Sequence, residues 1–177
     1  MVGTVEPRKG HALVLAACEE LWKNGEEINL IIVGKQGWMV KELVEQLRQH
    51  PEAAKRLFWL DTVSDEYLEI IYSECSALIA ASEGEGFGLP LVEAAKHGLP
   101  IVARDIPAFR EVAGEYACYF PDMKNPETLA KSLRAWLALY RTGMHKRSDN
   151  MPWLTWKQSA QQLFDAISGA FTYKTWP

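Results

Sequence analysis

Cysteine is scarce in this chain of 177 residues, which contains only Cys18, Cys75 and Cys118. The three lie far apart inside apolar segments, a pattern that suits buried, reduced thiols better than disulfides or a metal cage. The four histidines show no metal-ligand spacing, and there is no Asp-x-Asp motif. We therefore expect no metal site, and the reduced thiols favour a cytoplasmic location.

Long apolar runs are also missing from the sequence. No run approaches the roughly 20 residues that a membrane-spanning helix needs, and the N-terminus lacks the basic-then-apolar order of a secretory signal. We expect no transmembrane segment, while peripheral association with the inner face of a membrane stays open.

An excess of basic charge is absent as well. The 19 Lys and Arg residues are outnumbered by 23 Asp and Glu residues, so the formal net charge is −4. A chain with this balance has no electrostatic attraction for nucleic acid as a whole. Nucleic acid is therefore not an expected partner, and any anion must be held by a local site.

The residues that are present fit one globular domain, because 177 residues of which 48% are hydrophobic suffice for a sizeable core. Short β-rich runs alternate with stretches of helical periodicity. This alternation predicts an α/β fold, a single Rossmann-like, doubly wound parallel sheet with helices on both faces. The predicted strands cover residues 29–33, 57–60, 76–80, 101–103 and 117–120, and the predicted helices cover residues 11–23, 40–50, 65–72, 126–140 and about 155–167.

Local signals mark the ends of several predicted elements. Ser64 and Asn125 stand where N-cap residues are favoured, directly before a helical pattern. Residues 142–153 lose their periodicity and mix Gly143 and Pro152 with basic residues, which predicts a surface connection.

The stretch 83–95 combines glycine, proline and two glutamates in an order that a structural role alone does not explain. Glycines at 84, 86 and 88 let a ligand approach main-chain N–H groups. Pro90 suits the first turn of a helix, whose unpaired N–H donors favour a phosphate. The pattern predicts a sugar-nucleotide site, with Glu85 before the helix and Glu93 early within it.

The informative loops each follow a predicted strand. In a doubly wound sheet, ligands gather at the carboxyl ends of the strands. We therefore expect four loops to converge on one crevice, namely residues 3–9, 34–38, 61–64 and 82–89.

Glu85 and Glu93 resemble the E-x7-E signature of retaining glycosyltransferases of the GT4 type, which adopt the GT-B fold. Other segments resemble the C-terminal, donor-binding domain of that family in the same order. Residues 2–10 resemble its first strand and phosphate loop, residues 58–68 its base-binding strand end, and residues 105–114 the turn after its fifth strand. With the closing helix, the resemblance covers nearly the whole chain.

The resemblance implies a nucleoside diphosphate sugar as the donor, with its phosphates held by the loop that begins at Gly3. Lys9 matches the family's phosphate-binding lysine, whereas Thr4 stands at a position that is commonly basic in the family. Arg8 is suited to compensate because a guanidinium offers two donors to phosphate oxygens. Pairing with Glu6, or a place in solvent, is the alternative for Arg8.

The second part of the implied site is the glycine-rich loop and the helix after it. Main-chain N–H groups of residues 86–89 would contact the β-phosphate and sugar hydroxyls. The carboxylate of Glu93 would accept hydrogen bonds from both ribose hydroxyls, and an ionised acceptor strengthens such bonds. The residues implied in the main-chain contacts are Gly86, Phe87, Gly88 and Leu89.

Glu85 would face hydroxyls of the donor sugar, so that Glu85, Glu93 and Lys9 form the implied catalytic set. Val63 matches the position whose main chain reads the base edge in this family, which leaves a GDP-linked and a UDP-linked donor both open. Gly34 and Lys35 are weaker candidates for the crevice, and Lys35 is equally well explained as a surface lysine.

The implied reaction is transfer of a hexosyl group to an acceptor hydroxyl with retention at the anomeric carbon, without a further cofactor. A GT-B enzyme has two Rossmann-like domains, and residues 1–177 hold one. We expect this chain to be the donor half, inactive alone, and the acceptor-binding N-terminal half to lie on the same longer protein or on another chain.

The closing helix commonly reaches the N-terminal domain in this family, so Trp153 and Trp156 are candidate interdomain contacts. Packing on their own domain is the alternative.

Two other functions compete with this interpretation. One is a non-catalytic nucleotide-sugar-binding or regulatory module, and the other is a flavodoxin-like interaction domain that leaves the crevice unused. The intact Glu85 and Glu93 speak against a degenerate site. Within the family, the loop 3–9 resembles that of bacterial mannosyltransferases of surface polysaccharide assembly.

Overall fold

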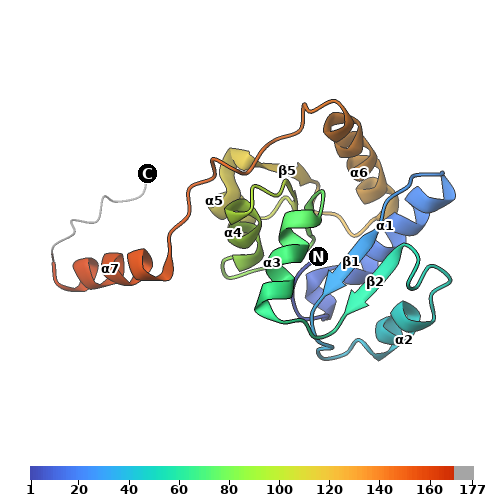
Figure 1. The fold of residues 1–177 in the computed structure, drawn as a ribbon, viewed down its shortest axis with the longest axis horizontal. Coiled ribbons are helices and arrows are strands. Elements are labelled where there is room, and N and C mark those ends of the chain that lie inside the picture. Colours follow the sequence, from blue (N-terminus) through green and yellow to red (C-terminus); the bar gives the residue numbers. More distant parts are fainter. Residues whose placement is uncertain (170–177) are drawn as a thin grey trace.

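Parallel strands flanked by helices make up the centre of the structure, a computed structural model that describes residues 1–169 (Figure 1). One pair of strands and one group of three are each hydrogen-bonded in parallel, in the orders β1-β2 and β3-β4-β5. The strands are β1 (Leu30–Val33), β2 (Leu57–Leu60), β3 (Leu78–Ala80), β4 (Ile101–Arg104) and β5 (Ala117–Phe120). Their positions and parallel pairing confirm the predicted fold class.

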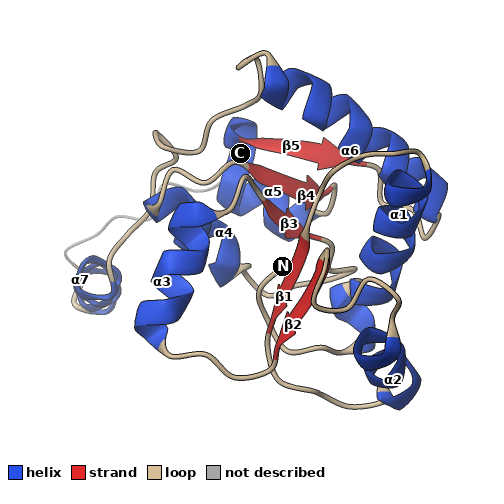
Figure 2. Cartoon of the chain, turned by 45° about the vertical axis from the view of Figure 1, so that its right-hand side comes forward, coloured by secondary structure: helices blue, strands red, loops and turns tan. Residues whose placement is uncertain are grey.

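The N-terminal segment lies between the two groups of strands. Isolated parallel bridges join Val2 to Val33 and Val5 to Gln36, so this segment runs along β1. Figure 2 places the N-terminus between β1 and β3. The predicted first strand is therefore an extended segment with two isolated bridges. Its carboxyl end leads directly into the loop that carries Lys9.

Helices cover both faces of the strands, as predicted. One core cluster joins side chains of α1, α2 and α6 to β1, β2 and part of β4, and the other joins α3, α4 and α5 to β3 and the rest of β4. Because successive residues of a strand point to opposite faces, Val102 lies in the first cluster, and Ile101 and Ala103 lie in the second. The helices are α1 (His11–Lys23), α2 (Lys41–Gln49), α3 (Asp65–Glu74), α4 (Leu89–Lys96), α5 (Pro107–Ala113), α6 (Pro126–Arg141) and α7 (Trp156–Ile167).

The predicted caps form as expected. The Oγ atom of Ser64 accepts a hydrogen bond from the Tyr67 N–H group at 3.2 Å, and Oδ1 of Asn125 accepts one from the Thr128 N–H group at 3.0 Å. Each bond satisfies one N–H donor that the first helical turn leaves free. The starts of α3 and α6 are thus determined by residues that the sequence makes visible.

Two local predictions need correction. The segment 105–114, expected as a turn, contains α5, which buries Phe109 and Ala113 one helical turn apart. A helix of this length offers too few apolar positions for a periodic pattern. The connection 142–153 is also less superficial than predicted, because Ser148 and Met151 are buried. Burial of Ser148 leaves no unpaired donor, because its hydroxyl donates to the Leu99 carbonyl at 2.7 Å.

The last helix, α7, extends away from the rest of the domain (Figure 1). A capping box of Thr155 and Gln158 begins it, yet none of its residues is buried. Trp156 is 80% exposed and Trp153 is 40% exposed. Packing on its own domain, the alternative considered for both tryptophans, is therefore not found for Trp156 in the described part of the chain.

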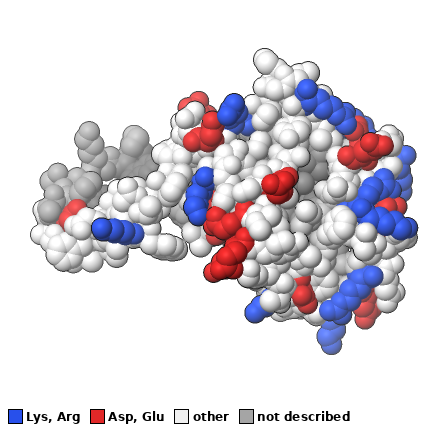
Figure 3. All heavy atoms as spheres, in the orientation of Figure 1, with Lys and Arg blue, Asp and Glu red and all other residues white. Residues whose placement is uncertain are grey.

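Acidic and basic side chains are mixed on the face that Figure 3 shows, whereas α7 is almost free of charge there. Within α7, only Lys157 and Asp165 carry charged side chains. Of the helices in residues 1–169, none has the length and apolar character needed to cross a membrane.

Gly10 allows the loop before α1 to lie against the end of β3. It has a φ of +73°, and a Cβ atom at this position would lie 2.4 Å from the Ala81 carbonyl oxygen. We expect Gly10→Ala to lower the free energy of unfolding by about 2–4 kcal/mol, the sum of left-handed backbone strain and local overpacking. Urea unfolding followed by circular dichroism measures this change.

Gly25→Ala is the matched control, because Gly25 has a similar φ of +81° and a Cβ atom added there would have no neighbouring atom within 4 Å. It should cost about 1 kcal/mol, from backbone strain alone. Equal costs for the two substitutions would show that the approach of Gly10 to Ala81 contributes nothing.

Candidate functional site

Two loops from distant parts of the chain meet at the carboxyl ends of the strands. The first loop, residues 3–10, contacts the glycine-rich loop, residues 82–88, through a main-chain hydrogen bond from the Glu83 N–H group to the Arg8 carbonyl at 2.8 Å. Gly10 packs on Ala81, directly before the glycine-rich loop. The predicted convergence of these two loops is therefore present in the structure.

The contact brings two cations to one carboxylate. Lys9 Nζ lies 2.5 Å from Glu85 Oε1, and Arg8 Nη1 lies 3.3 Å from Glu85 Oε2. The same Arg8 nitrogen donates to the Gly84 carbonyl at 2.8 Å, and the Ser82 hydroxyl donates to Glu85 Oε1 at 2.7 Å. Arg8 also pairs with Glu6 at 2.9 Å, which is the alternative considered for this residue, while its contact with Glu85 was not predicted.

The surroundings of Glu85 favour its ionised form. Burial by itself would raise the pKa of this carboxyl group. The hydrogen bonds from Lys9 and Ser82, together with the charges of Lys9 and Arg8, outweigh burial and hold the pKa below its ordinary value. Glu85 is therefore an anion at neutral pH, placed between two cations.

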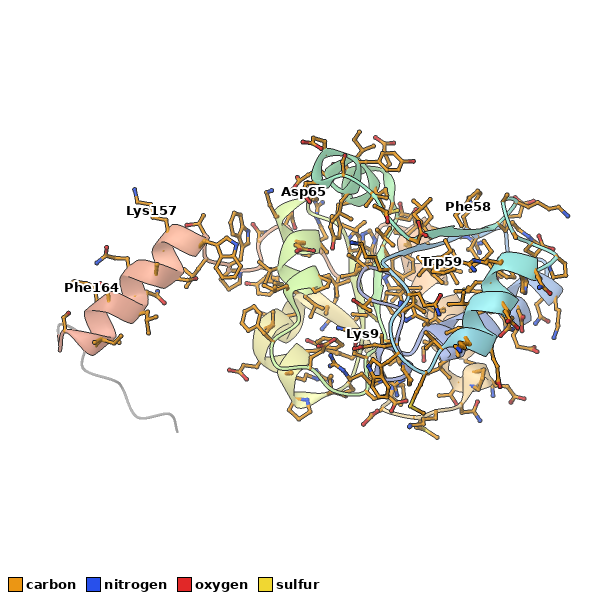
Figure 4. All side chains as sticks on the ribbon, turned by 90° about the horizontal axis from the view of Figure 1, so that it is seen from below. Lys9, Phe58, Trp59, Asp65, Lys157 and Phe164 are labelled. Atoms are coloured by element: carbon orange, nitrogen blue, oxygen red, sulfur yellow. The ribbon has the colours of Figure 1, made fainter. Side chains whose placement is uncertain are left out.

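A narrow cavity, open to solvent, lies beside this cluster and is lined by Lys9, Ser82, Glu85 and Gly88. Figure 4 shows Lys9 near the middle of the domain. The floor is apolar and includes Leu78 and Phe109 among other residues. A few convergent polar groups over apolar walls are the kind of lining that small-molecule sites have.

His11 also lines the cavity, and the sequence did not indicate it. It is buried, and both of its ring nitrogens lack a hydrogen-bond partner within residues 1–169. Burial, followed by the charges of the N-terminus and Lys9, lowers its pKa to about 4. The ring is therefore neutral at physiological pH. Its place directly after Gly10 was the available signal, but its burial depends on tertiary packing.

Gly88 is the N-cap of α4 and permits a tight turn beside the cavity. Its φ is +104°, and a Cβ atom would lie 2.9 Å from Phe109 Cε1. Gly86, Phe87 and Leu89 are exposed around this helix start. Helix N-termini favour anions because their N–H groups point outward. The residues expected to bind phosphate through their main-chain N–H groups thus lie at one helix end.

Glu93 lies on α4, half-buried, and does not line the cavity that contains Glu85. The hydroxyl of Tyr72, on α3, donates to Glu93 Oε2 at 2.6 Å. Tyr72 lines a second hollow, which shares Met1, Val2 and Leu78 with the first cavity. Glu85 lines the first hollow, whereas Glu93 lines neither and reaches the second only through Tyr72, so the action of both glutamates on one ligand remains a prediction.

The remaining candidates lie on neighbouring loops. A Cβ atom on Gly3 would approach Lys9 Cε at 3.8 Å, and one on Gly34 would lie 2.0 Å from the Gly3 carbonyl oxygen, so these two glycines pack together under the first loop. Val63 is half-buried just before the N-cap of α3. Lys35 is exposed, which agrees with the alternative that it is a surface lysine.

Metal-binding geometry is not found in the described part of the chain, where no three His, Cys, Asp or Glu side chains group around a common point. Cys18, Cys75 and Cys118 are free thiols. Burial raises the pKa of the Cys18 thiol to about 12, so this group is a neutral, unreactive part of the core.

Comparison with known sequences identifies related proteins. Residues 1–151 match the family described as glycosyl transferases group 1. A serotype-specific mannosyltransferase, WbdA of Escherichia coli, is 58% identical over 163 residues, which are 92% of this chain and 20% of that protein. An O-antigen chain mannosyltransferase, RfbU of Salmonella typhimurium, is 30% identical over 151 residues, covering 85% of this chain and 35% of that protein. The chain thus spans about a fifth of WbdA.

Comparison with solved structures identifies the same fold. HepE of Anabaena, crystallised in complex with UDP and glucose, has a TM-score of 0.72 at 19% identity, over 95% of this chain and 48% of that one. The C-terminal domain of the group 1 glycosyl transferase LpcC of Francisella tularensis has a TM-score of 0.67 at 18% identity, over 92% of this chain and 84% of that one. The sequence and structure matches confirm the predicted resemblance and its fold.

The ion cluster gives a pH-dependent prediction. Removing the Glu85 charge by Glu85→Gln leaves Lys9 without its partner, and we expect a loss of about 1–3 kcal/mol in the free energy of unfolding at pH 7. Because the folded-state pKa of Glu85 is lowered, its stabilising effect is present above the unfolded pKa of about 4.5 and is lost as the pH falls through the folded value. Unfolding curves from pH 7 to pH 3 test this.

The difference between wild type and Glu85→Gln should therefore shrink as the pH falls below about 4.5. Glu127→Gln is a suitable control, because Glu127 is exposed in the first turn of α6. A stability difference for Glu85→Gln that is the same at pH 7 and pH 3 would contradict the ion pairing.

Proposed function

This chain belongs to the glycosyl transferases group 1 family, and on that premise we propose that it is the C-terminal, donor-binding domain of a retaining glycosyltransferase. The domain binds a nucleoside diphosphate sugar, and the complete enzyme transfers the hexosyl group to an acceptor hydroxyl with retention at the anomeric carbon. The observation that carries the proposal is the cluster of Lys9, Arg8 and Glu85 beside the cavity and the start of α4.

Charge stabilisation is the main chemical demand of this reaction, because negative charge grows on the diphosphate as the glycosidic bond breaks. Lys9 and Arg8 supply positive charge, and the N-terminal end of α4 adds outward-pointing N–H groups. Lys9 is only 17% exposed, so its interaction with a phosphate would be weakly screened by water. Gly3, and the main-chain N–H groups of residues 86–89, complete the phosphate contacts in this proposal.

Glu85 has a second task once a donor is bound. In the structure its carboxylate neutralises Lys9 and accepts from Ser82. When phosphate oxygens take over part of the contact with Lys9, the carboxylate becomes available to hydroxyls of the transferred sugar. Correct orientation of the sugar lowers the barrier by removing unproductive geometries. We therefore assign Glu85 a positioning and electrostatic role, without a covalent intermediate.

The donor is proposed to carry mannose, because relatives at 58% and 30% identity are named mannosyltransferases. Glu93 binds the ribose, and the main chain of Val63 contacts the base. Main-chain contacts distinguish bases by hydrogen-bond pattern, so a GDP-linked and a UDP-linked donor are compared directly in the experiment below.

The acceptor half is proposed to lie elsewhere in a longer protein, since this chain spans 20% of WbdA. The exposed apolar side chains of α7 support α7 as a contact with that half. Phe164 points away from the rest of the domain in Figure 4. The exposed residues are Trp156, Leu163, Phe164 and Ile167, in addition to Trp153 before the helix. The free thiols are compatible with a cytoplasmic location, and we propose that the enzyme acts there at the inner face of the membrane.

Nucleotide binding is the direct test of the donor site. Calorimetric titration of residues 1–177 with GDP, UDP, GDP-mannose and UDP-glucose should show binding of at least one nucleotide, and little or no sugar transfer. Lys9→Ala should weaken that binding about 10-fold or more, because it removes a charge-assisted hydrogen bond to phosphate. Lys131→Ala, which changes an exposed lysine on α6, should have no effect.

If none of the four compounds binds, the donor-site proposal is refuted. Sugar transfer by the isolated chain would refute the assignment of the acceptor half to another domain.

The proposed role of α7 is tested with the full-length protein. Phe164→Ser should leave the unfolding of the isolated domain unchanged within about 0.5 kcal/mol, because the side chain is 66% exposed. In the full-length enzyme the same change should reduce transferase activity and lower the unfolding temperature. Gln162→Ser, on the opposite side of α7, is the control. Identical effects of the two changes in the full-length protein would contradict an interdomain contact at Phe164.

A further inference from the structure

Tyr72 makes a strong hydrogen bond to the glutamate that the proposed function assigns to the ribose. Its hydroxyl donates to Glu93 Oε2 at 2.6 Å, joining α3 to α4. An O–H donor at this distance from a carboxylate is among the stronger hydrogen bonds in proteins. Burial, the hydrogen bond to Glu93 and the Glu93 charge all raise the pKa of Tyr72, so that the hydroxyl remains a donor.

The Tyr72 ring is held in one orientation. It is 3% exposed and stacks on His97, with ring centroids 5.6 Å apart and planes 8° from parallel. His97 Nε2 in turn lies 2.8 Å from Glu69 Oε2, and Lys96 Nζ lies 3.0 Å from Glu69 Oε1. Contacts between α3 and α4 thus constrain the hydroxyl that reaches Glu93.

The bond occupies one carboxylate oxygen and leaves the other for a ligand. Of the hydrogen bonds within residues 1–169, the one from Tyr72 is the only one that reaches the Glu93 carboxylate, and it ends on Oε2. Two neighbouring hydroxyls of a ribose are best bound by a carboxylate whose plane does not rotate. A fixed acceptor loses less conformational entropy on binding than a free side chain does.

We propose that Tyr72 is a positioning residue, which orients the Glu93 carboxylate for the vicinal hydroxyls of the nucleotide ribose and so favours ribonucleotides over deoxyribonucleotides. The proposal rests on the function proposed above, because it requires Glu93 to face the ribose. It adds a residue from α3, a helix outside the glycine-rich loop and the first loop.

A purely structural role for Tyr72 is the competing explanation, since the ring also belongs to the core cluster around α3, α4 and α5. Tyr72→Phe separates the two roles, because it keeps the ring and removes only the hydroxyl. Loss of packing would lower stability without changing the preference for a ribose hydroxyl. Loss of positioning would change that preference.

The experiment measures binding of UDP, GDP and their 2′-deoxy forms by calorimetry to wild type, Tyr72→Phe, Glu93→Gln and the double variant. Of UDP and GDP, wild type should bind the one with the higher affinity about 10-fold more tightly than its 2′-deoxy form. Glu93→Gln should abolish most of this preference for the ribonucleotide, which is the ratio of the two affinities. Tyr72→Phe should reduce the ratio about 3-fold to 5-fold, and in the Glu93→Gln background it should have no further effect.

Tyr119→Phe is the matched control. The Tyr119 hydroxyl donates to the Gly114 carbonyl at 2.9 Å and to the Phe109 carbonyl at 3.2 Å, so this variant also loses a bonded hydroxyl. It should keep the wild-type ratio. If Tyr72→Phe does not fold, His97→Ala removes the stacking partner instead and should reduce the ratio in the same direction.

The outcomes separate the inference from the proposed function. If Tyr72→Phe, or His97→Ala as its substitute, keeps the wild-type preference for ribonucleotide over 2′-deoxynucleotide while Glu93→Gln loses it, the role of Tyr72 is overturned and that of Glu93 stands. A wild-type ratio in Glu93→Gln would overturn the ribose contact and the inference with it. Failure of the wild-type chain to bind any nucleotide would overturn both.

Discussion

The pairing of Lys9 with Glu85 is the interaction on which the organisation of the site depends. The first loop carries two adjacent cations, Arg8 and Lys9, and the glycine-rich loop supplies the carboxylate that balances them. Apart from a single 3-10 turn at Pro7–Lys9, these loops have no helix or strand. The ion cluster, the main-chain hydrogen bond from Glu83 to Arg8 and the close approach of Gly10 to Ala81 therefore fix their relative position. The parallel strands beneath bring the loops together, and the charges determine how they meet.

Much of this arrangement could be predicted from the sequence, because its signals are local. Alternating apolar patterns located the strands and most helices, Ser64 and Asn125 located two helix starts, and the glycines with Glu85 located the loop at the site. Helix α5 was missed because it has too few residues for a periodic pattern. Ser148 was missed because a serine is buried only when a distant carbonyl, here that of Leu99, accepts its hydrogen bond.

Within the site, the residues that could not be predicted act through contacts across the fold. His11 follows the first loop directly, but its low pKa arises from its burial in the fold and from the charges of the N-terminus and Lys9. Tyr72 precedes Glu93 by 21 positions and belongs to another helix. No spacing rule within one helix joins such a pair. Residues that contact a ligand leave a mark in the local sequence, whereas residues that orient them depend on how helices pack.

Helix α7 has a practical consequence for work with this domain. It is well capped and amphipathic, yet its apolar side chains face solvent and its charged residues are few. Contiguous exposed apolar surface of this kind promotes association between copies and adsorption to hydrophobic surfaces. A preparation of the domain by itself would thus depend on dilution or on a mild detergent to remain monodisperse, and mass per particle would rise with concentration.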